Sequence, residues 1–236
     1  LVVALTSLLL KKTALGMYIQ SVGINKRASQ LVGIKSVLII FLTYAYCGLC
    51  SGLAGLIASS RIYSADANNI GLNMELDAIL AVAIGGNSLG GGKFSLAGSV
   101  IGAFTIQALT TTLYAMHVSS DQVLQGGENL FYRKKRWQQE RRQHDMKGKM
   151  KLKQNSFLLL VTILLFFIMY GIGCVLFNAQ GFSKTQNFLN LFISNAGLIV
   201  IGIGMTVVMI TGGIDISVGS FVAMGCMMLA WMMEKG

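Results

Sequence analysis

The amino-acid sequence predicts an all-α protein that crosses a membrane several times. Of its 236 residues, 54% are apolar and only 12% are charged, against ~25% in soluble domains. Ten basic and two acidic residues lie between Arg133 and Lys153, so this stretch alone holds +8 of the net charge of +10. The other residues carry too little charge to cover a globule in water. The composition therefore excludes a disordered chain, a disulfide-rich secreted module and a soluble enzyme.

Uncharged runs mark the expected membrane segments, because a helix needs about 20 apolar residues to cross ~30 Å of hydrocarbon. Four runs exceed this length, at 36–60, 94–120, 154–183 and 185–214, and a fifth at 216–233 is borderline. We expect helices over 36–58, 94–116, 155–177 and 188–211, and a last apolar stretch over 221–233. Residues 1–10 resemble the end of a helix whose beginning is absent. Together these runs predict a polytopic transmembrane helical bundle of about five to six membrane segments.

Residues 78–86, AILAVAIGG, form an apolar piece that is too short to span and that ends in glycines. Such a piece is typical of a broken or re-entrant helix, which is tolerated at membrane depth only when protein buries it. An ordinary helix that starts before Glu75 explains the same residues equally well. The sequence leaves both alternatives open.

Basic residues orient the chain, since loops rich in Lys and Arg stay in the cytoplasm. The connection 11–35 is placed inside by Lys11, Lys12, Lys26, Arg27 and Lys35. The basic run 133–153 is the strongest inside signal, yet no apolar run between 118 and 132 returns the chain to that side. Either the basic run lies outside, against the rule, or a membrane span is missing.

Asp215 stands in the segment TGGIDISVGS between two uncharged runs. An ionisable group at membrane depth costs about 2.5–3.5 kcal/mol on insertion scales, so it usually faces a polar cavity or partner. We interpret Asp215 as a residue of a pathway or gate, or as a helix-end cap at the membrane interface, with Gly212, Gly213 and Gly219 forming a turn. These two interpretations are compatible.

The segment Glu75–Lys93 combines two carboxylates with a glycine-rich turn, in ELDAILAVAIGGNSLGGGK. Glu75 and Asp77 do not share a helix face at this spacing, which weakens any paired-carboxylate catalysis. The turn lacks the phosphate-loop pattern because Phe94 follows Lys93. Tight helix packing at a cavity wall is the favoured interpretation of the turn.

The cysteines and histidines form no pattern that indicates catalysis or metal binding. Cys47 and Cys50 lie beside small residues in an uncharged helix, which favours close helix packing over a redox or metal site. His117 and His144 are isolated, so no Ser-His-Asp or His-metal arrangement can be assembled. We therefore predict no catalytic residue and no metal. The basic run 133–153 is interpreted as an inside anchor, with binding to nucleic acid or anionic lipid as the alternative.

The connection 11–35 carries the strongest functional signal in the sequence. It is basic and amphipathic, and it lies between two apolar segments. A connection of this kind can form a short helix outside the bilayer that docks a soluble partner. A plain solvated connection is the alternative.

Three segments resemble one family of membrane proteins. They are KKTALGMYIQSVGINKRASQLVGI, SADANNIGLNMELDAILAVAIGGNSLGGGKF and VIGIGMTVVMITGGIDISVGSFVAMG. The chain is similar to the inner-membrane permease subunits of bacterial monosaccharide ABC importers, the ribose and galactose class, and most similar to the permease pair of galactofuranose importers. In that family the GGID element precedes the ELDAI element, whereas here the order is reversed.

The reversed order implies two joined permease pieces. Residues 1–122 resemble the C-terminal part of one permease, and residues 154–236 resemble the N-terminal part of the next. Between them, 123–153 is expected to be a basic junction and cytoplasmic leader. The final helix that the first piece lacks accounts for the missing inward crossing, so the chain is expected to be incomplete as it stands.

The resemblance implies a permease component that moves a monosaccharide, with galactofuranose as a candidate, into the cytoplasm and performs no chemistry itself. The implied partners are a cytoplasmic ABC ATPase, a periplasmic sugar-binding protein, a second permease subunit and membrane lipid, but no nucleic acid. ATP would bind to the separate ATPase subunit, so no cofactor is expected for this chain. The implied location is a bacterial inner membrane.

Site residues follow from the same resemblance. Arg27, Ala28, Ser29 and Gly33 fit the spacing of the ATPase-coupling motif E-A-A-x-x-x-G, with Arg in place of Glu and Ser in place of the second Ala. The candidate residues of the translocation path or gate are Asp215, Gly213, Glu75 and Asp77.

Two other functions are open on the sequence. A secondary transporter or channel would need ionisable groups inside the membrane, for which Asp215 is the candidate. A membrane scaffold protein would bind its partner through the basic run 133–153.

Overall fold

A computed structural model describes residues 1–62, 70–92, 94–115, most of 160–175 and 185–235. All regular structure within these residues is helical, as the sequence predicts. The basic run 133–153, the junction 123–153, His117 and His144 lie outside the described residues. The interpretations of those residues therefore stay predictions.

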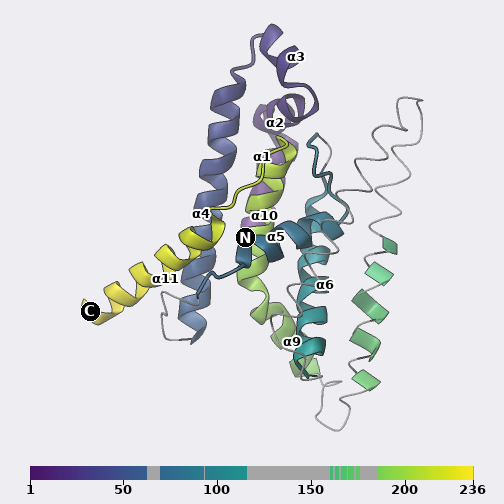
Figure 1. Ribbon diagram of the computed structural model, residues 1–236, viewed down its shortest axis with the longest axis vertical. Helices are drawn as coiled ribbons and strands as arrows, with labels where there is room; N and C mark the ends of the chain where they lie inside the picture. Colours follow the sequence, from purple (N-terminus) through teal and green to yellow (C-terminus); the bar gives the residue numbers. More distant parts are fainter. Residues whose placement is uncertain are drawn as a thin grey trace.

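The named helices form a bundle that is elongated along one axis (Figure 1). They are α1 (Val2–Lys12), α2 (Ala14–Ile24), α3 (Lys26–Leu31), α4 (Ser36–Ile62), α5 (Met74–Ile84), α6 (Leu96–Ala115), α9 (Thr185–Ser194), α10 (Ala196–Ile210) and α11 (Val218–Lys235). Within the described residues, the segment Ser36–Arg61 of α4 is long and apolar enough to cross a membrane. The pair α1 and α2 passes the same test only together, and the two helices are bent by 76° at their junction.

Helix α10 lies at the centre of the bundle, between α4 on one side and α5 and α6 on the other (Figure 1). Every residue from Val200 to Ile210 is buried. By contrast, α4 exposes Phe41 and Leu49 at 66% and 69% of their surfaces. This distribution fits a helix enclosed by protein beside a helix that faces lipid, because lipid is as apolar as the side chains it contacts.

Close backbone contacts hold the helices around α10 together. Gly55 of α4 faces the backbone of α11, and a Cβ atom added at Gly55 would overlap the carbonyl oxygen of Val222. Gly23 of α2 approaches the carbonyl oxygen of Ile210 in the same way. Small residues permit such contacts, which replace the hydrophobic effect as a source of helix association in lipid.

A buried polar network ties α5 and α6 to α10. Asn87, which is 3% exposed, lies between α5 and α6; its Nδ2 donates to Ser99 Oγ (2.8 Å) and its Oδ1 accepts from the backbone N–H of Ser95 (2.6 Å). The hydroxyl groups of Ser99 and Thr206 are 2.6 Å apart and join α6 to α10. An unpaired polar group in hydrocarbon costs several kcal/mol, so this network favours one arrangement of the three helices.

The structure corrects one of the expected segments. The helix expected over 188–211 is divided, because Asn195 separates α9 from α10 and its Nδ2 donates to the Ala103 carbonyl oxygen of α6 (3.1 Å). Residues 78–84 belong to α5, which begins at Met74 and has only 11 residues, so both alternatives for the piece 78–86 stay open. The helix expected over 36–58 is confirmed by α4.

The connection 11–35 is also more ordered than the sequence indicates. It contains the end of α1, all of α2 and the short helix α3. Gly16, Ile19 and Val22 of α2 are buried against the bundle, so only the part around α3 extends beyond it (Figure 1).

A pair of glycines on one helix tests the close contact between α4 and α11. Gly55→Ala should destabilise the protein by about 1–3 kcal/mol through overpacking. Gly52→Ala is the matched control: a Cβ atom there meets nothing within 4 Å, and the better helix propensity of Ala should leave stability equal or up to ~1 kcal/mol higher. Thermal unfolding in detergent measures both, and equal losses for the two variants would contradict this packing.

A double-mutant cycle tests the network between α6 and α10. Ser99→Ala and Thr206→Val remove the two hydroxyl groups that face each other, and we expect a coupling energy of ~1 kcal/mol between them. Unfolding in mixed micelles supplies the free energies. The control cycle pairs Ser99→Ala with Thr105→Val, whose hydroxyl donates to Ile101 of its own helix (2.9 Å). Coupling energies that are indistinguishable in the two cycles would count against the interhelical bond.

Candidate functional site

The segment between α10 and α11 is non-helical and lies beside the middle of α4. Tyr44 Oη donates to the carbonyl oxygen of Ile214 (3.2 Å), and a Cβ atom at Gly213 would lie 2.5 Å from the same Oη. Tyr44 follows Ser36, the first residue of α4, by eight residues, which is about 12 Å along the helix axis. Counted from Ser36 as the edge of a ~30 Å hydrocarbon core, the segment lies ~12 Å deep, where irregular backbone must be enclosed by protein or line a cavity.

Asp215 is held within this segment. Its side chain is 4% exposed, and its Oδ1 accepts from the backbone N–H (3.0 Å) and the Oγ (2.6 Å) of Ser217. The carboxylate also lies close enough to Tyr44 and Cys47 of α4 to interact with them electrostatically. Gly212, with a φ of 82°, and Gly213 lie in the non-helical segment, whereas Gly219 lies in the first turn of α11; both interpretations of Asp215 stay predictions.

Glu75 reaches the same place from α5. It lies in the first turn of α5, and a Cβ atom at Gly219 would lie 2.6 Å from its Oε2. Gly219 is in the first turn of α11, where the unpaired N–H groups of a helix favour negative charge. Glu75 thus lies beside the first turn of α11, and Asp215 lies in the non-helical segment just before that helix. Asp77 shares the first turn of α5 and is half-buried.

The glycine-rich turn after α5 is a packing element. The N–H of Gly92 donates to the Ile210 carbonyl oxygen at the end of α10 (2.8 Å). Gly91 and Gly92 have φ values of 84° and 88°, which only glycine adopts readily. A Cβ atom at Gly91 would lie 2.9 Å from the carbonyl oxygens of both Gly23 and Ile210. The turn therefore closes on protein backbone, as the packing interpretation predicts.

Sequence reasoning did not single out the polar residues that hold this region. Asn87 lies inside the turn that drew attention for its glycines, and its partners Ser99 and Thr206 lie in separate apolar runs. The signal that could have found Asn87 is a polar amide between glycine pairs at the end of an apolar helix. The hydroxyl groups carry no such signal, because Ser and Thr are common in membrane helices.

The proposed coupling residues lie on and after the short helix α3. Asn25 caps this helix, since its side chain accepts from the backbone N–H of Ala28 (3.1 Å). The buried Ser29 donates from Oγ to the Asn25 carbonyl oxygen (2.9 Å). Gly33 ends the turn with a φ of 89°, and Arg27 is exposed. The four residues of the motif thus form one compact unit at the end of the bundle (Figure 1).

This unit presents apolar side chains and is linked to α4. Leu31 and Val32 are 89% and 81% exposed, next to the basic Lys26 and Arg27. Gln30 Nε2 donates to the hydroxyl of Ser36 (2.7 Å), the first residue of α4. A force applied to α3 would therefore be transmitted to the start of α4.

The cysteines serve helix packing in the structure. Cys47 and Cys50 are buried on α4, and Gly204 of α10 leaves room for them, because a Cβ atom there would lie 2.9 Å from Cys50 Cβ. Cys226 of α11 donates from Sγ to the Gly55 carbonyl oxygen (3.0 Å). Among the described residues, no group of three or more His, Cys, Asp or Glu side chains could hold a metal ion.

Comparisons with known proteins show what the chain is similar to. Residues 1–130 match the family described as "Branched-chain amino acid transport system / permease component". The galactofuranose transporter permease protein YtfT of Escherichia coli (strain K12) is 56% identical over 104 residues, which are 44% of this chain and 30% of that protein. No solved structure matches the chain.

Other relatives are sugar permeases as well. The fructose import permease protein FruF of Bifidobacterium longum (strain NCC 2705) is 46% identical over 121 residues, 51% of this chain and 34% of that protein. The ribose import permease protein RbsC of Haemophilus influenzae (strain ATCC 51907 / DSM 11121 / KW20 / Rd) is 43% identical over 120 residues, 51% of this chain and 37% of that protein. The chain thus spans about a third of the length of the curated relatives it matches.

The family match covers more than half of the chain. It confirms the predicted fold class, a polytopic all-α membrane protein, and the predicted location in a bacterial inner membrane. It also agrees with the prediction that the chain is a transport component and no enzyme. The chain belongs to the family of branched-chain amino acid transport system permease components.

Proposed function

We propose that the chain is a permease component of an ATP-binding-cassette importer that carries a monosaccharide into the cytoplasm. The names of the relatives support the substrate class, since they are permeases for galactofuranose, fructose and ribose. The observation that carries the proposal is the unit around α3, which presents Leu31 and Val32 beyond the bundle and is bonded to the start of α4. A soluble ATPase could dock on such a surface.

The contacts in the bundle suggest how docking is coupled to the membrane. A cytoplasmic ABC ATPase that closes on ATP would move α3, and the bond from Gln30 to Ser36 would pass this movement to α4. Two turns further along, Tyr44 holds the Ile214 carbonyl oxygen. A shift of α4 would therefore reposition the segment that contains Asp215. ATP stays on the ATPase, so this chain needs no cofactor in the proposed mechanism.

The sugar would pass near the start of α11. Asp215, Gly213, Glu75 and Asp77 are our candidates for the path or gate, because Glu75 lies beside Gly219 in the first turn of α11 and the buried Asp215 lies in the non-helical segment just before that helix. Discontinuous helices that end near the midplane form binding sites in many transporters. A periplasmic sugar-binding protein and a second permease subunit would complete the assembly. Galactofuranose is the first sugar to test, because the galactofuranose permease is 56% identical over its matched residues.

The order of the motifs suggests that the chain joins pieces of two neighbouring permeases, 1–122 and 154–236, through 123–153. In this proposal the functional importer contains a complete partner permease as well. Resequencing the locus tests the idea, and a single intact frame with conserved length in related strains would contradict it.

One observation favours a second candidate function. A secondary transporter needs ionisable groups at membrane depth, and this chain has the buried Asp215 just before α11 and Glu75 beside the first turn of that helix. Uptake into proteoliposomes separates the two functions. An importer component needs the ATPase, the binding protein and ATP, while a secondary transporter takes up sugar under a proton or sodium gradient alone.

Truncation of the exposed apolar pair on α3 tests the docking surface. The double variant Leu31→Ala, Val32→Ala should lower stimulation of the partner ATPase at limiting concentration ~5-fold, the loss in affinity that corresponds to ~1 kcal/mol of binding free energy for the two truncations together. Val37→Ala is the matched control, because Val37 is 73% exposed in the first turn of α4. Stimulation that is equal in all three proteins would rule out docking at α3.

A further inference from the structure

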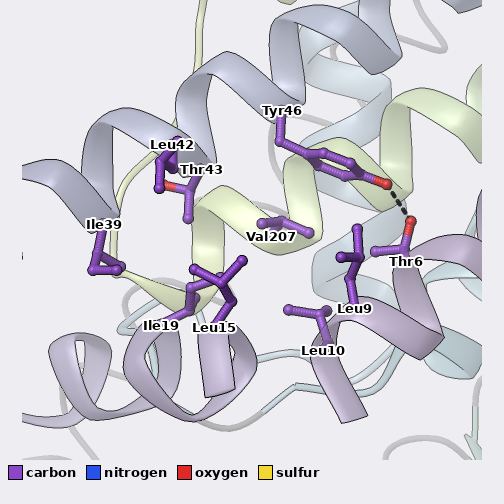
Figure 2. Close-up of a pocket in the computed structure, with 10 residues that line it drawn as sticks. All are labelled: Thr6, Leu9, Leu10, Leu15, Ile19, Ile39, Leu42, Thr43, Tyr46 and Val207. Atoms are coloured by element: carbon purple, nitrogen blue, oxygen red, sulfur yellow. Dashed lines mark hydrogen bonds between the residues drawn. The ribbon is translucent and has the colours of Figure 1, made fainter. Parts of the chain in front are cut away.

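An apolar pocket lies between α1, α2, α4 and α10, away from the start of α11. Its volume is about 170 Å³. Figure 2 shows leucines from α1 and α2 facing Ile39, Leu42 and Thr43 of α4, with Val207 of α10 at the back. Apolar cavities of about this size (~150 Å³) stay dry and accept an apolar guest.

The polar groups that line the pocket are already engaged. The hydroxyls of Thr6 and Tyr46 bond to each other at one end (Figure 2), and Thr43 Oγ1 donates to the Ile40 carbonyl oxygen (2.7 Å). A polar guest such as a sugar would find no free partner among these hydroxyls. The pocket is therefore suited to hydrocarbon and not to the cargo of an importer.

The pocket opens on the outer surface of the bundle. Leu15 and Leu42 line it and are nevertheless 41% and 42% exposed. On α4 the neighbouring Leu38 and Phe41 are 51% and 66% exposed. In a membrane protein an apolar surface of this kind contacts acyl chains. The pocket spans Ile39 to Tyr46 of α4, about 10 Å, which is roughly two thirds of one leaflet of a ~30 Å hydrocarbon core.

Positive charge surrounds the end of the pocket where α1 stops and α4 starts. Lys11 and Lys12 directly follow the lining residue Leu10, and Lys35 precedes the lining residue Ile39 by one turn. All three lysines are exposed. Residues 1–62 contain six Lys or Arg and no Asp or Glu, so no acidic side chain of these helices neutralises them.

We propose that this pocket binds one acyl chain of an anionic phospholipid, whose phosphate is held by Lys11, Lys12 and Lys35. The apolar cavity and the lysines are adjacent along the helix axis, in the order that an acyl chain and its headgroup require. Each basic residue near an anionic membrane surface strengthens lipid binding. Binding at this site differs from the general attraction of basic residues to an anionic membrane surface, because the pocket holds the acyl chain while the lysines hold the headgroup.

Photocrosslinking of the full chain in nanodiscs tests the charge requirement. A photoreactive phosphatidylglycerol should label α1, α2 or α4 at least tenfold more than the matching phosphatidylcholine. The triple variant Lys11→Gln, Lys12→Gln, Lys35→Gln should lose this preference. The control Lys26→Gln, Arg27→Gln, Arg61→Gln removes three charges away from the pocket and should keep it. Equal labelling by the two lipids in the unmodified chain would overturn the proposal.

A second pair of variants tests the cavity. Leu42→Trp fills the rim of the pocket and should reduce phosphatidylglycerol labelling at least fivefold, whereas Leu38→Trp, one turn away on the exposed surface, should leave it unchanged. Thermal unfolding of both variants serves as the control that each of them folds. Unchanged labelling in Leu42→Trp, or crosslinks from the pocket to a second protein chain, would overturn the site.

Discussion

The enclosure of α10 is the constraint on which the rest of the structure depends. All residues of Val200–Ile210 are buried, so every neighbour of α10 must approach closely. The fold meets this demand with backbone contacts at glycines, such as Gly204 opposite Cys47 and Cys50 on α4. A side chain at Gly204 would push α4 away from α10. Because α11 packs on α4, it would move as well.

The surrounding lipid explains a second feature of the bundle: its buried polar side chains form hydrogen bonds with one another. Asn87, Ser99 and Thr206 satisfy one another across three elements, and Asp215 is satisfied by Ser217 in its own segment. In water each of these bonds would compete with solvent and contribute ~1 kcal/mol. Inside hydrocarbon the alternative is an unpaired group, so the same contacts select a single packing arrangement.

Much of the fold could be predicted from the sequence, because an uncharged apolar run of about 20 residues indicates a helix that crosses the membrane. This argument found α4 and α6. It could not find the break at Asn195, since the amide that separates α9 from α10 acts through a carbonyl group on α6. The meeting of Glu75 with the start of α11 was equally hidden, because the two lie more than a hundred residues apart in the chain. The unit around α3 was predictable as part of a basic connection. The exposure of its Leu31 and Val32 was not, because it depends on how α3 is capped.

Helix α10 also determines how the chain is assembled in space. Apart from its sequence neighbour α9, it contacts α1, α2, α4, α5 and α6, all from residues 1–115, while α10 itself belongs to 185–235. The core therefore forms between two distant stretches of one polypeptide and does not rely on the peptide bonds that connect them. Two separately synthesised fragments, one ending after α6 and one beginning before α9, contain the surfaces needed to reassemble this core by complementation.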